Sequence, residues 1–271
     1  MAISAAAVVA GALAIPIAGG AASAANLIPA TVAEPTSSSS IESLVTYIST
    51  TVAPKHGVKL TIKNIDDPNV MNQATASNQV NGELENPNYL QVVLSANPGY
   101  HLRVAAKFLK LGSGIWSSKY KTLADLPTGA KVELGSNAQD ISLGLDILVQ
   151  AKLITLKNGT NPNSAGISDI ASNPKQLTFP LIDDALMPRT LGNVDAVVGY
   201  NAFFDAAKTP QKYLIANLGE ALGFAFSLIV PTQGDNKTVT KKLTAIFSDP
   251  LIQTYIRSHP KIMTNQVLPI R

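Results

Sequence analysis

Strand-like and helix-like segments alternate along this chain of 271 residues, and this alternation limits the fold more than any other feature. Residues 39–52 place their apolar side chains on one helical face. Residues 58–63, "VKLTIK", alternate strictly between apolar and polar side chains, as a half-buried strand does. Strand-like segments return at 194–200 and 224–231, and two amphipathic helices close the chain. This order favours α/β units with parallel strands.

Local signals predict where several elements begin and end. Ser39 and Glu42 have the spacing of a capping box at a helix start. Pro180 interrupts the strand-like residues 177–182, which predicts a strand end or a sheet edge. A further helix is expected over 141–151. Other expectations are a plain turn at 111–114, a short helix at 169–172 and a helix-capping role for Asp183 and Asp184.

The late return of strand and helix suggests two α/β lobes joined by crossing segments. Ligands of open α/β sheets bind outside the carboxyl ends of the strands, and the cleft between two lobes is the default site. Asn137, Tyr200 and Asn201 each follow a predicted strand, and Trp116, the single tryptophan, lies where the first lobe would end. For each of these residues, ligand contact competes with a structural role in a strand end or the core.

The first 25 residues carry no charge, and residues 5–18 form an apolar run of signal-peptide length. We expect a cleaved export signal over 1–25, with an uncleaved membrane anchor or an alanine-rich disordered leader as alternatives. The chain contains no cysteine, so disulfides, thiol catalysis and lipid attachment through cysteine are not expected. Together these features favour a periplasmic or secreted protein.

Composition and motifs argue against several functions. Hydrophobic residues make up 46% of the chain and charged residues 14%, as in a folded protein, and the 21 basic residues are spread out, so nucleic acid is not an expected partner. No phosphate-binding glycine motif and no nucleophile elbow occurs. His56, His101 and His259 lack metal-ligand spacing. We therefore expect no catalytic residues, no metal and no cofactor.

In several motifs the chain resembles the NlpA/MetQ family, which comprises the substrate-binding proteins of methionine-type ABC importers. The strongest are "IWSSKYKTLADLPTGAKVEL", "ILVQAKLITLKNGT" and "ISDIASNPKQLTFPLIDDALMPRTLGNVDAVV". "HGVKLTIKNIDDPNVMNQA" and "NGELE" resemble the N-terminal half of the family more loosely.

The resemblance implies a type II periplasmic-binding-protein fold of two α/β lobes, residues 27–112 with 222–271 and residues 113–221. It implies that a monomer captures an amino acid or a related small polar solute outside the cytoplasm and delivers it to an ABC permease and its ATPase. Two other functions stay open: a ligandless sensor or interaction protein, and an enzyme on the same scaffold.

The chain departs from the family where a ligand would be held. In an alignment without gaps, the arginine that binds the ligand carboxylate corresponds to Gly144, and the asparagine before it to Ile141. A family tyrosine is replaced by Pro68. Asn88 and Tyr89 resemble the remnants of an asparagine and tyrosine segment, and Arg189 or Arg103 could supply the missing charge. The altered anchor points to a solute that is held differently from methionine.

Overall fold

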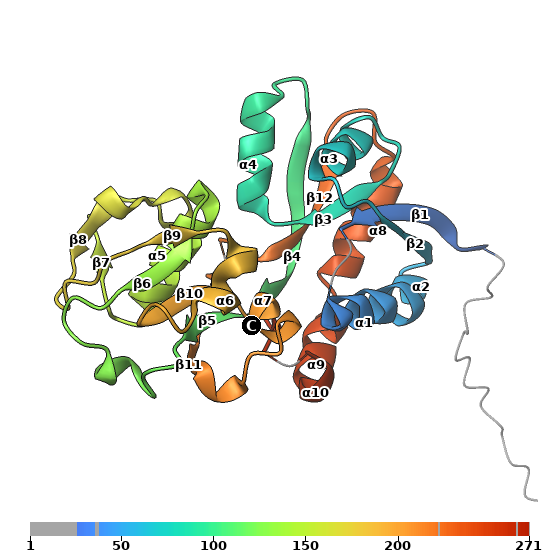
Figure 1. The fold of residues 1–271 in the computed structure, drawn as a ribbon. Coiled ribbons are helices and arrows are strands. Elements are labelled where there is room, and N and C mark those ends of the chain that lie inside the picture. Colours follow the sequence, from blue (N-terminus) through green and yellow to red (C-terminus); the bar gives the residue numbers. More distant parts are fainter. Residues whose placement is uncertain (1–25, 36–37, 222, 264, 271) are drawn as a thin grey trace, which may run out of the picture.

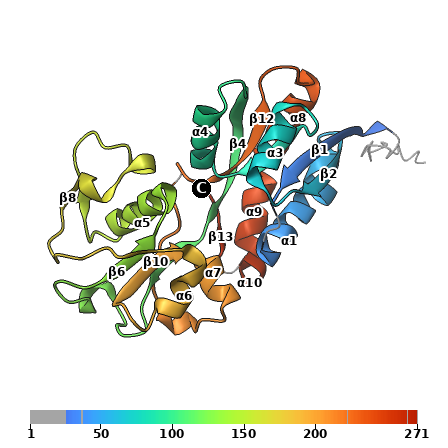
Figure 2. The ribbon, with the colours of Figure 1, turned by 45° about the horizontal axis from the view of Figure 1, so that its top comes forward.

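The computed structural model describes residues 26–35, 38–221, 223–263 and 265–270, so the expected export signal over 1–25 lies outside the described residues. Two α/β lobes lie side by side, each built around its own twisted sheet (Figure 1). The two lobes are also distinct in a rotated view, in which α5 belongs to one lobe and α3, α4 and α8 belong to the other (Figure 2).

The first lobe contains a six-stranded mixed sheet in the order β13-β4-β12-β3-β1-β2. Its strands are β1 (Ile28–Glu34), β2 (Val58–Asn64), β3 (Gly82–Glu85), β4 (Leu102–Leu111), β12 (Phe226–Pro231) and β13 (Val267–Leu268). Its helices are α1 (Ser39–Tyr47), α2 (Ala53–Lys55), α3 (Pro68–Ala76), α4 (Pro87–Ala96), α8 (Lys237–Phe247), α9 (Pro250–Ser258) and α10 (Pro260–Met263), and a π-helical turn, Ile48–Val52, joins α1 to α2. β1 runs parallel to β2 and to β3, whereas β12 is antiparallel to both of its neighbours.

The second lobe contains a five-stranded sheet in the order β11-β5-β10-β6-β9. Its strands are β5 (Ser113–Trp116), β6 (Val132–Gly135), β9 (Leu181–Ile182), β10 (Ala196–Tyr200) and β11 (Leu214–Asn217). Its helices are α5 (Ala138–Gln150), α6 (Met187–Thr190) and α7 (Asn201–Ala206), and β7 (Thr155–Leu156) pairs with β8 (Ile170–Ser172) as a separate ribbon. The apolar faces of α5 and the sheet pack around Leu134, Leu148 and Val198.

Two segments cross between the lobes, and close packing at one of them requires a glycine. β4 leads through Gly112 into β5, and residues 218–225 lead from β11 back to β12. A Cβ atom on Gly112 would lie 1.6 Å from the carbonyl oxygen of Asn265, so no larger residue fits without movement of the backbone. The Gly112 amide donates to the carbonyl of Gln266 at 2.7 Å. The C-terminal segment therefore packs directly against this crossing.

The structure confirms the predicted strands over 58–63, 194–200 and 224–231 to within a few residues, and β9 lies at a sheet edge as expected. Three local predictions were wrong. The N-cap of α1 is Ser38 and makes no side-chain capping bond, so the expected box at Ser39 is absent. Residues 111–114 form a crossing between lobes rather than a plain turn, and Ile170–Ser172 is a strand because it pairs with β7.

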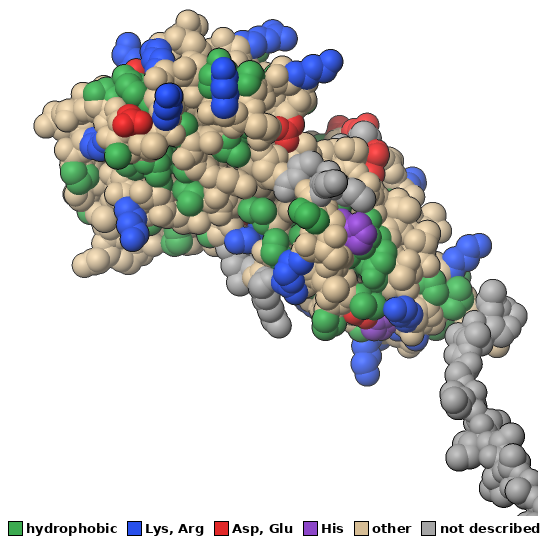
Figure 3. Space-filling view, turned by 90° about the horizontal axis from the view of Figure 1, so that it is seen from below, with side chains coloured by type: hydrophobic (Ala, Val, Ile, Leu, Met, Phe, Trp, Pro, Cys, Tyr) green, Lys and Arg blue, Asp and Glu red, His purple; other side chains and the backbone are tan. Residues whose placement is uncertain are grey.

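Lys and Arg side chains lie singly over the face shown in Figure 3, without a dense basic patch. Within the described ranges, none of the helices combines the length and the apolar character needed to span a membrane.

Candidate functional site: a cavity between the lobes

A cavity of about 320 Å³ lies between the two lobes, a volume suited to a small solute. The first lobe lines it with Pro35, Asp66, Pro68, Met71, Leu84, Glu85, Asn86, Tyr89 and Phe226, the second lobe with Gln139, Asp140 and Tyr200, and the crossing segment between β11 and β12 with Phe224. Both lobes and one crossing segment therefore build one site.

The topology explains why these residues meet. The parallel strands β1, β2 and β3 end at or just before Pro35, Asp66 and Glu85, so their carboxyl ends converge on the cavity. In the second lobe, the parallel strands β6 and β10 end just before α5 and at Tyr200. The cavity thus occupies the position where open α/β sheets hold their ligands.

Three helices begin at the cavity, and capping side chains occupy part of their free N–H groups. Asp67 accepts from the backbone amides of Asn69 and Val70 at the start of α3. Asn86 accepts from the amide of Asn88 at the start of α4. Asn137 does the same for the first amides of α5. Because these caps satisfy the amides, fewer of them are available to an anionic ligand.

The carboxyl group of Glu85, in the cavity lining, has a strongly raised pKa. Its side chain is almost completely buried, and Oε2 has no hydrogen-bond partner. Burial, followed by the charge of nearby Glu83, raises the pKa of Glu85 from 4.5 to about 9. A pKa in this range favours the protonated carboxyl group at neutral pH.

A second acidic pair lies on the side of α5. Asp140, in the first turn of α5, lies next to Asp184, and the Asn137 amide donates to the Asp140 carboxylate. Burial, followed by the charge of Asp140, raises the pKa of Asp184 to about 7. Burial also raises the pKa of Asp140. The two carboxyl groups lie close enough that ionisation of one disfavours ionisation of the other.

No Lys, Arg or His belongs to the lining of this cavity in the part of the chain that the structure describes. The ionisable groups of the lining are three carboxylic acids and two tyrosines: Asp66, Glu85, Asp140, Tyr89 and Tyr200. Lys107 lines a neighbouring hollow of about 730 Å³, which shares Gln139 with the cavity. The electrostatic character of the cavity itself is acidic.

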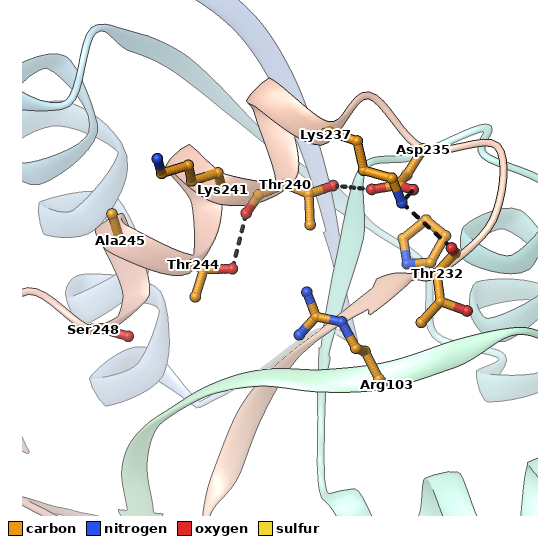
Figure 4. A pocket seen from close by; sticks show the side chains of 10 residues that line it. Arg103, Thr232, Asp235, Lys237, Thr240, Lys241, Thr244, Ala245 and Ser248 are labelled. Carbon is orange, nitrogen blue, oxygen red and sulfur yellow. Dashed lines mark hydrogen bonds and ion pairs between the residues drawn. The ribbon is translucent and has the colours of Figure 1, made fainter.

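Neither arginine that was expected to replace the missing anchor lies in this cavity. Arg103 projects from β4 into a different hollow, of about 610 Å³, beside α8 (Figure 4). Lys237 lines the same hollow and pairs with Asp235 at 2.5 Å. Arg189 is exposed on α6 and is not part of the cavity lining. The predicted role of Arg189 in binding is therefore not supported by its position.

Two of the predicted contact residues, Tyr89 and Tyr200, lie in the cavity lining. Asn88 lies beside it in the neighbouring hollow, and its Nδ2 donates to the carbonyl oxygen of Asn163 at 3.1 Å. This bond joins α4 of the first lobe to a turn of the second lobe.

Ligand contact and a structural role were both open for Trp116, Asn137 and Asn201, and all three lie outside the lining of this cavity. Trp116 is fully buried, stacks on Phe204 with ring centroids 4.4 Å apart and donates to Asn201 Oδ1 at 3.0 Å. Asn201 is also buried and binds Asn217 and the carbonyl of Asn265. Asn137 is an exposed helix cap. Their positions indicate structural roles in the core and at a helix start.

Gly144 shows why the gap-free alignment of the family arginine gives no ligand contact. A Cβ atom on Gly144 would lie 2.9 Å from Cδ2 of Leu134, so this position faces the sheet of the second lobe. The side chains of α5 that reach the cavity are Gln139 and Asp140, one turn earlier. At the cavity, α5 therefore presents an acid instead of a cation.

Sequence reasoning missed the acids Asp66, Glu85 and Asp140 and the aromatic residues Phe224 and Phe226. Glu85 ends the segment "NGELE", so the rule that ligands bind at carboxyl ends of strands could have found it. The helix was expected to begin only at residue 141, although α5 already begins at Ala138 and contains Asp140. No local signal distinguishes Phe224 from an ordinary core residue.

Comparison with known proteins shows to which family this chain belongs. The family model described as NlpA lipoprotein matches residues 36–270. The chain belongs to the NlpA lipoprotein family. The methionine-binding lipoprotein MetQ of Bacillus subtilis is 32% identical over 138 residues, 51% of this chain and 50% of that protein. The chain thus spans about half the length of this curated relative in the match.

Solved structures of binding proteins match nearly the whole chain. An ABC transporter periplasmic substrate-binding protein from Coxiella burnetii has a TM-score of 0.69 and 25% identity, covering 89% of this chain and 99% of its own. A nutrient-binding protein from Burkholderia cenocepacia, solved bound to methionine, has a TM-score of 0.67 and 25% identity over the same shares. The predicted two-lobed substrate-binding-protein fold is confirmed.

These relatives also correct one expectation. The absence of cysteine had suggested a protein without a lipid anchor, but the matching family is a lipoprotein family and MetQ is named a lipoprotein. The inference that the protein is free of a lipid anchor is therefore not supported.

Proposed function

We propose that this member of the NlpA family is the extracytoplasmic substrate-binding protein of an ABC importer for an amino acid or a related small solute. The observation that carries the proposal is the cavity of about 320 Å³ between two lobes, at the carboxyl ends of their parallel strands. A relative of this fold was solved with methionine bound. A monomer would deliver its solute to a membrane permease driven by an ATPase.

The lobes suited to closing around a solute are residues 27–112 with 222–271, and residues 113–221. Two crossing segments connect them, one through Gly112 and one through residues 218–225. Buried Glu220 ties these segments together, because its Oε1 accepts from the Leu111 amide at 2.8 Å. A short, tied connection of this kind suits a hinge between rigid lobes.

The cavity and the relatives weigh against the two rival functions. A ligandless sensor would have its cleft filled by side chains, whereas here open volume separates the lobes. Carboxyl groups such as those of Glu85 and Asp140 can serve as acid and base in enzymes, so it is the relatives, rather than the lining, that weigh against an enzyme. The relatives whose names state a function are binding proteins. We therefore propose binding without chemical conversion.

A thermal-shift screen of the full chain tests the proposal. Amino acids, dipeptides, organic amines and organic anions would each be added at about 1 mM, and at least one should raise the melting temperature, because a ligand that binds only the folded state stabilises it by RT ln(1 + [L]/Kd). Mass spectrometry should recover that solute unchanged. Absence of any shift across the panel would contradict a receptor function, and conversion of the solute would favour the enzyme.

A further inference from the structure

The cavity between the lobes combines acidic and aromatic side chains. Asp66 and Glu85 approach from the first lobe and Asp140 from the second, while Tyr89, Tyr200, Phe224 and Phe226 supply aromatic surface. Glu85 is 7% exposed, and its Oε2 has no hydrogen-bond partner. A buried acceptor without a partner carries a desolvation cost that a donor on a ligand would remove. The lining is therefore complementary to a donor that bears positive charge.

Aromatic rings add to this complementarity. The negative faces of aromatic rings attract ammonium groups, and sites for such ligands pair rings with carboxylates. Met71, Leu84 and Pro68 complete an apolar wall for the uncharged part of a ligand.

A ligand carboxylate, by contrast, finds little to hold it. The described lining contains no Lys, Arg or His, and capping side chains occupy amides at the starts of α3, α4 and α5. A carboxylate placed next to Asp66 and Asp140 would be repelled by their negative charge when these acids are ionised. An α-amino acid therefore gains from its ammonium group in this cavity and loses from its carboxylate.

We propose that the cavity selects an organic cation without a carboxylate: an ammonium group carried on a small aliphatic or aromatic body. This inference rests on the proposed receptor function and narrows its substrate class. A bare metal ion is a poorer match, because no group of three or more His, Cys, Asp or Glu side chains within the described residues is arranged to hold one. Eight of the thirteen residues that line the cavity are apolar or aromatic, and a metal ion would leave this surface unused.

Proton release should accompany binding. The ionisable groups around Glu85 are Glu83 on its own strand, Asp66 and Tyr89 of the same lobe, and Asp140 and Tyr200 across the cleft. Lys107 lies in the next hollow. None of the groups in the cavity itself is basic, and Glu85 has a pKa of about 9 when the cavity is empty. A bound cation stabilises the ionised carboxylate, so binding should release a proton and should strengthen as pH rises from 6 to 8.

Isothermal titration of the full chain with methylthiopropylamine and with L-methionine tests the proposal, because the two solutes differ only by the carboxylate. We expect the amine to bind about tenfold more tightly, the scale of one lost charge pair near a protein surface. Potassium chloride at the same ionic strength should give no heat of binding. Titrations in buffers of different ionisation enthalpy should show proton release.

Single substitutions distinguish the effect of acids in the cavity on binding from the effect of the overall charge of the protein. Asp140→Asn and Glu85→Gln should each weaken binding of the amine about tenfold, and Glu85→Gln should also reduce the pH dependence, the rest of which belongs to the pair Asp140 and Asp184. Glu42→Gln removes an exposed acid of the same lobe and should leave affinity within about twofold. Melting curves without ligand verify that each variant folds.

The possible results distinguish the two proposals. If L-methionine binds as tightly as the amine or more tightly, the cation selectivity is overturned and the receptor function stands. If the amine binds equally well to both cavity variants and to the parent, the assignment to this cavity is wrong. If neither these two solutes nor any member of the wider panel binds, both the selectivity and the receptor function fall.

Discussion

The side-chain amide of Asn88 donates to the carbonyl oxygen of Asn163 at 3.1 Å, and this bond links α4 of the first lobe to the second lobe across the cleft. The hydroxyl group of Ser142, on α5, donates to the same carbonyl oxygen at 3.3 Å. The bond lies beside the cavity rather than in it, so Asn88 is placed to stabilise the closed arrangement of the lobes without contacting a solute.

Replacing Asn88 with alanine should loosen the two lobes. Loss of one partly buried hydrogen bond is worth about 1 kcal/mol, which shifts a closed-to-open equilibrium about fivefold. Small-angle X-ray scattering of the protein without ligand should show a larger radius of gyration for Asn88→Ala. Gln91→Ala, an exposed position on the same helix, is the matched control. Identical scattering of Asn88→Ala and the parent would show that this bond does not hold the lobes together.

Gly112→Ala should strongly destabilise the protein, because the new Cβ would lie 1.6 Å from the carbonyl oxygen of Asn265. The crossing segment and the C-terminal segment would have to separate, at a cost of about 3 kcal/mol or more, as for other overpacked sites. Urea unfolding gives the free energy of unfolding. Gly99→Ala, where a Cβ would meet no atom within 4 Å, should change it by less than about 0.5 kcal/mol. Similar values for both variants would contradict the tight packing at the crossing.

Stability without ligand should fall as pH rises. Glu85 keeps its proton in the folded protein up to a pKa of about 9 but loses it near 4.5 when unfolded. Its contribution is therefore fully present below about pH 4.5 and is lost progressively up to about pH 9, and at pH 7 the loss is on the order of 3 kcal/mol. Glu34, Glu83 and Asp184, with pKa values of about 7, add losses of the same sign that are complete near pH 7.

Glu85→Gln isolates this effect, since glutamine cannot ionise. Its melting temperature should exceed that of the parent by several degrees at pH 8, at about 2–4 °C for each kcal/mol, and should match the parent at about pH 4.5. Differential scanning calorimetry across this range measures it, with Glu42→Gln as the control. A parent protein that melts at higher temperature at pH 8 than at pH 5 would contradict the prediction.

Trp116→Phe should lower stability without changing affinity. The variant loses the bond from Trp116 Nε1 to Asn201 Oδ1 and part of the contact with Phe204, which together should cost about 1–3 kcal/mol. Urea unfolding measures the loss. The Kd for L-methionine or methylthiopropylamine, whichever binds, should stay within about twofold because Trp116 lies outside the cavity lining. A tenfold change in Kd with unchanged stability would return Trp116 to the binding site.

Much of the fold could be predicted from local patterns. The strict alternation of "VKLTIK" and the apolar run before Tyr200 identified β2 and β10, because periodicity reports burial within one element. Errors arose where pairing with a distant segment decides the structure. Ile170–Ser172 is a strand only because β7 lies beside it, and residues 111–114 cross between lobes only because β4 and β5 belong to different sheets.

The candidate site could be predicted only in part. Tyr200 and Tyr89 were identified from a strand end and from family remnants, and both lie in the cavity lining. Trp116 and Asn201 lie 85 residues apart in sequence, and nothing local indicates that they bind each other in the interior. Each satisfies the polar group of the other, which removes both from the surface where a solute could reach them.

The sequence by itself determined the alternation of elements, the family and the absence of an arginine between positions 104 and 188, because these properties reside in the order of residues. Only the tertiary structure decided that Asp66, Glu85 and Asp140 share one cavity. They follow different strands in two lobes, and the path of the crossing segments brings those strand ends together. The charge that a solute meets is set by this three-dimensional convergence, which no local pattern encodes.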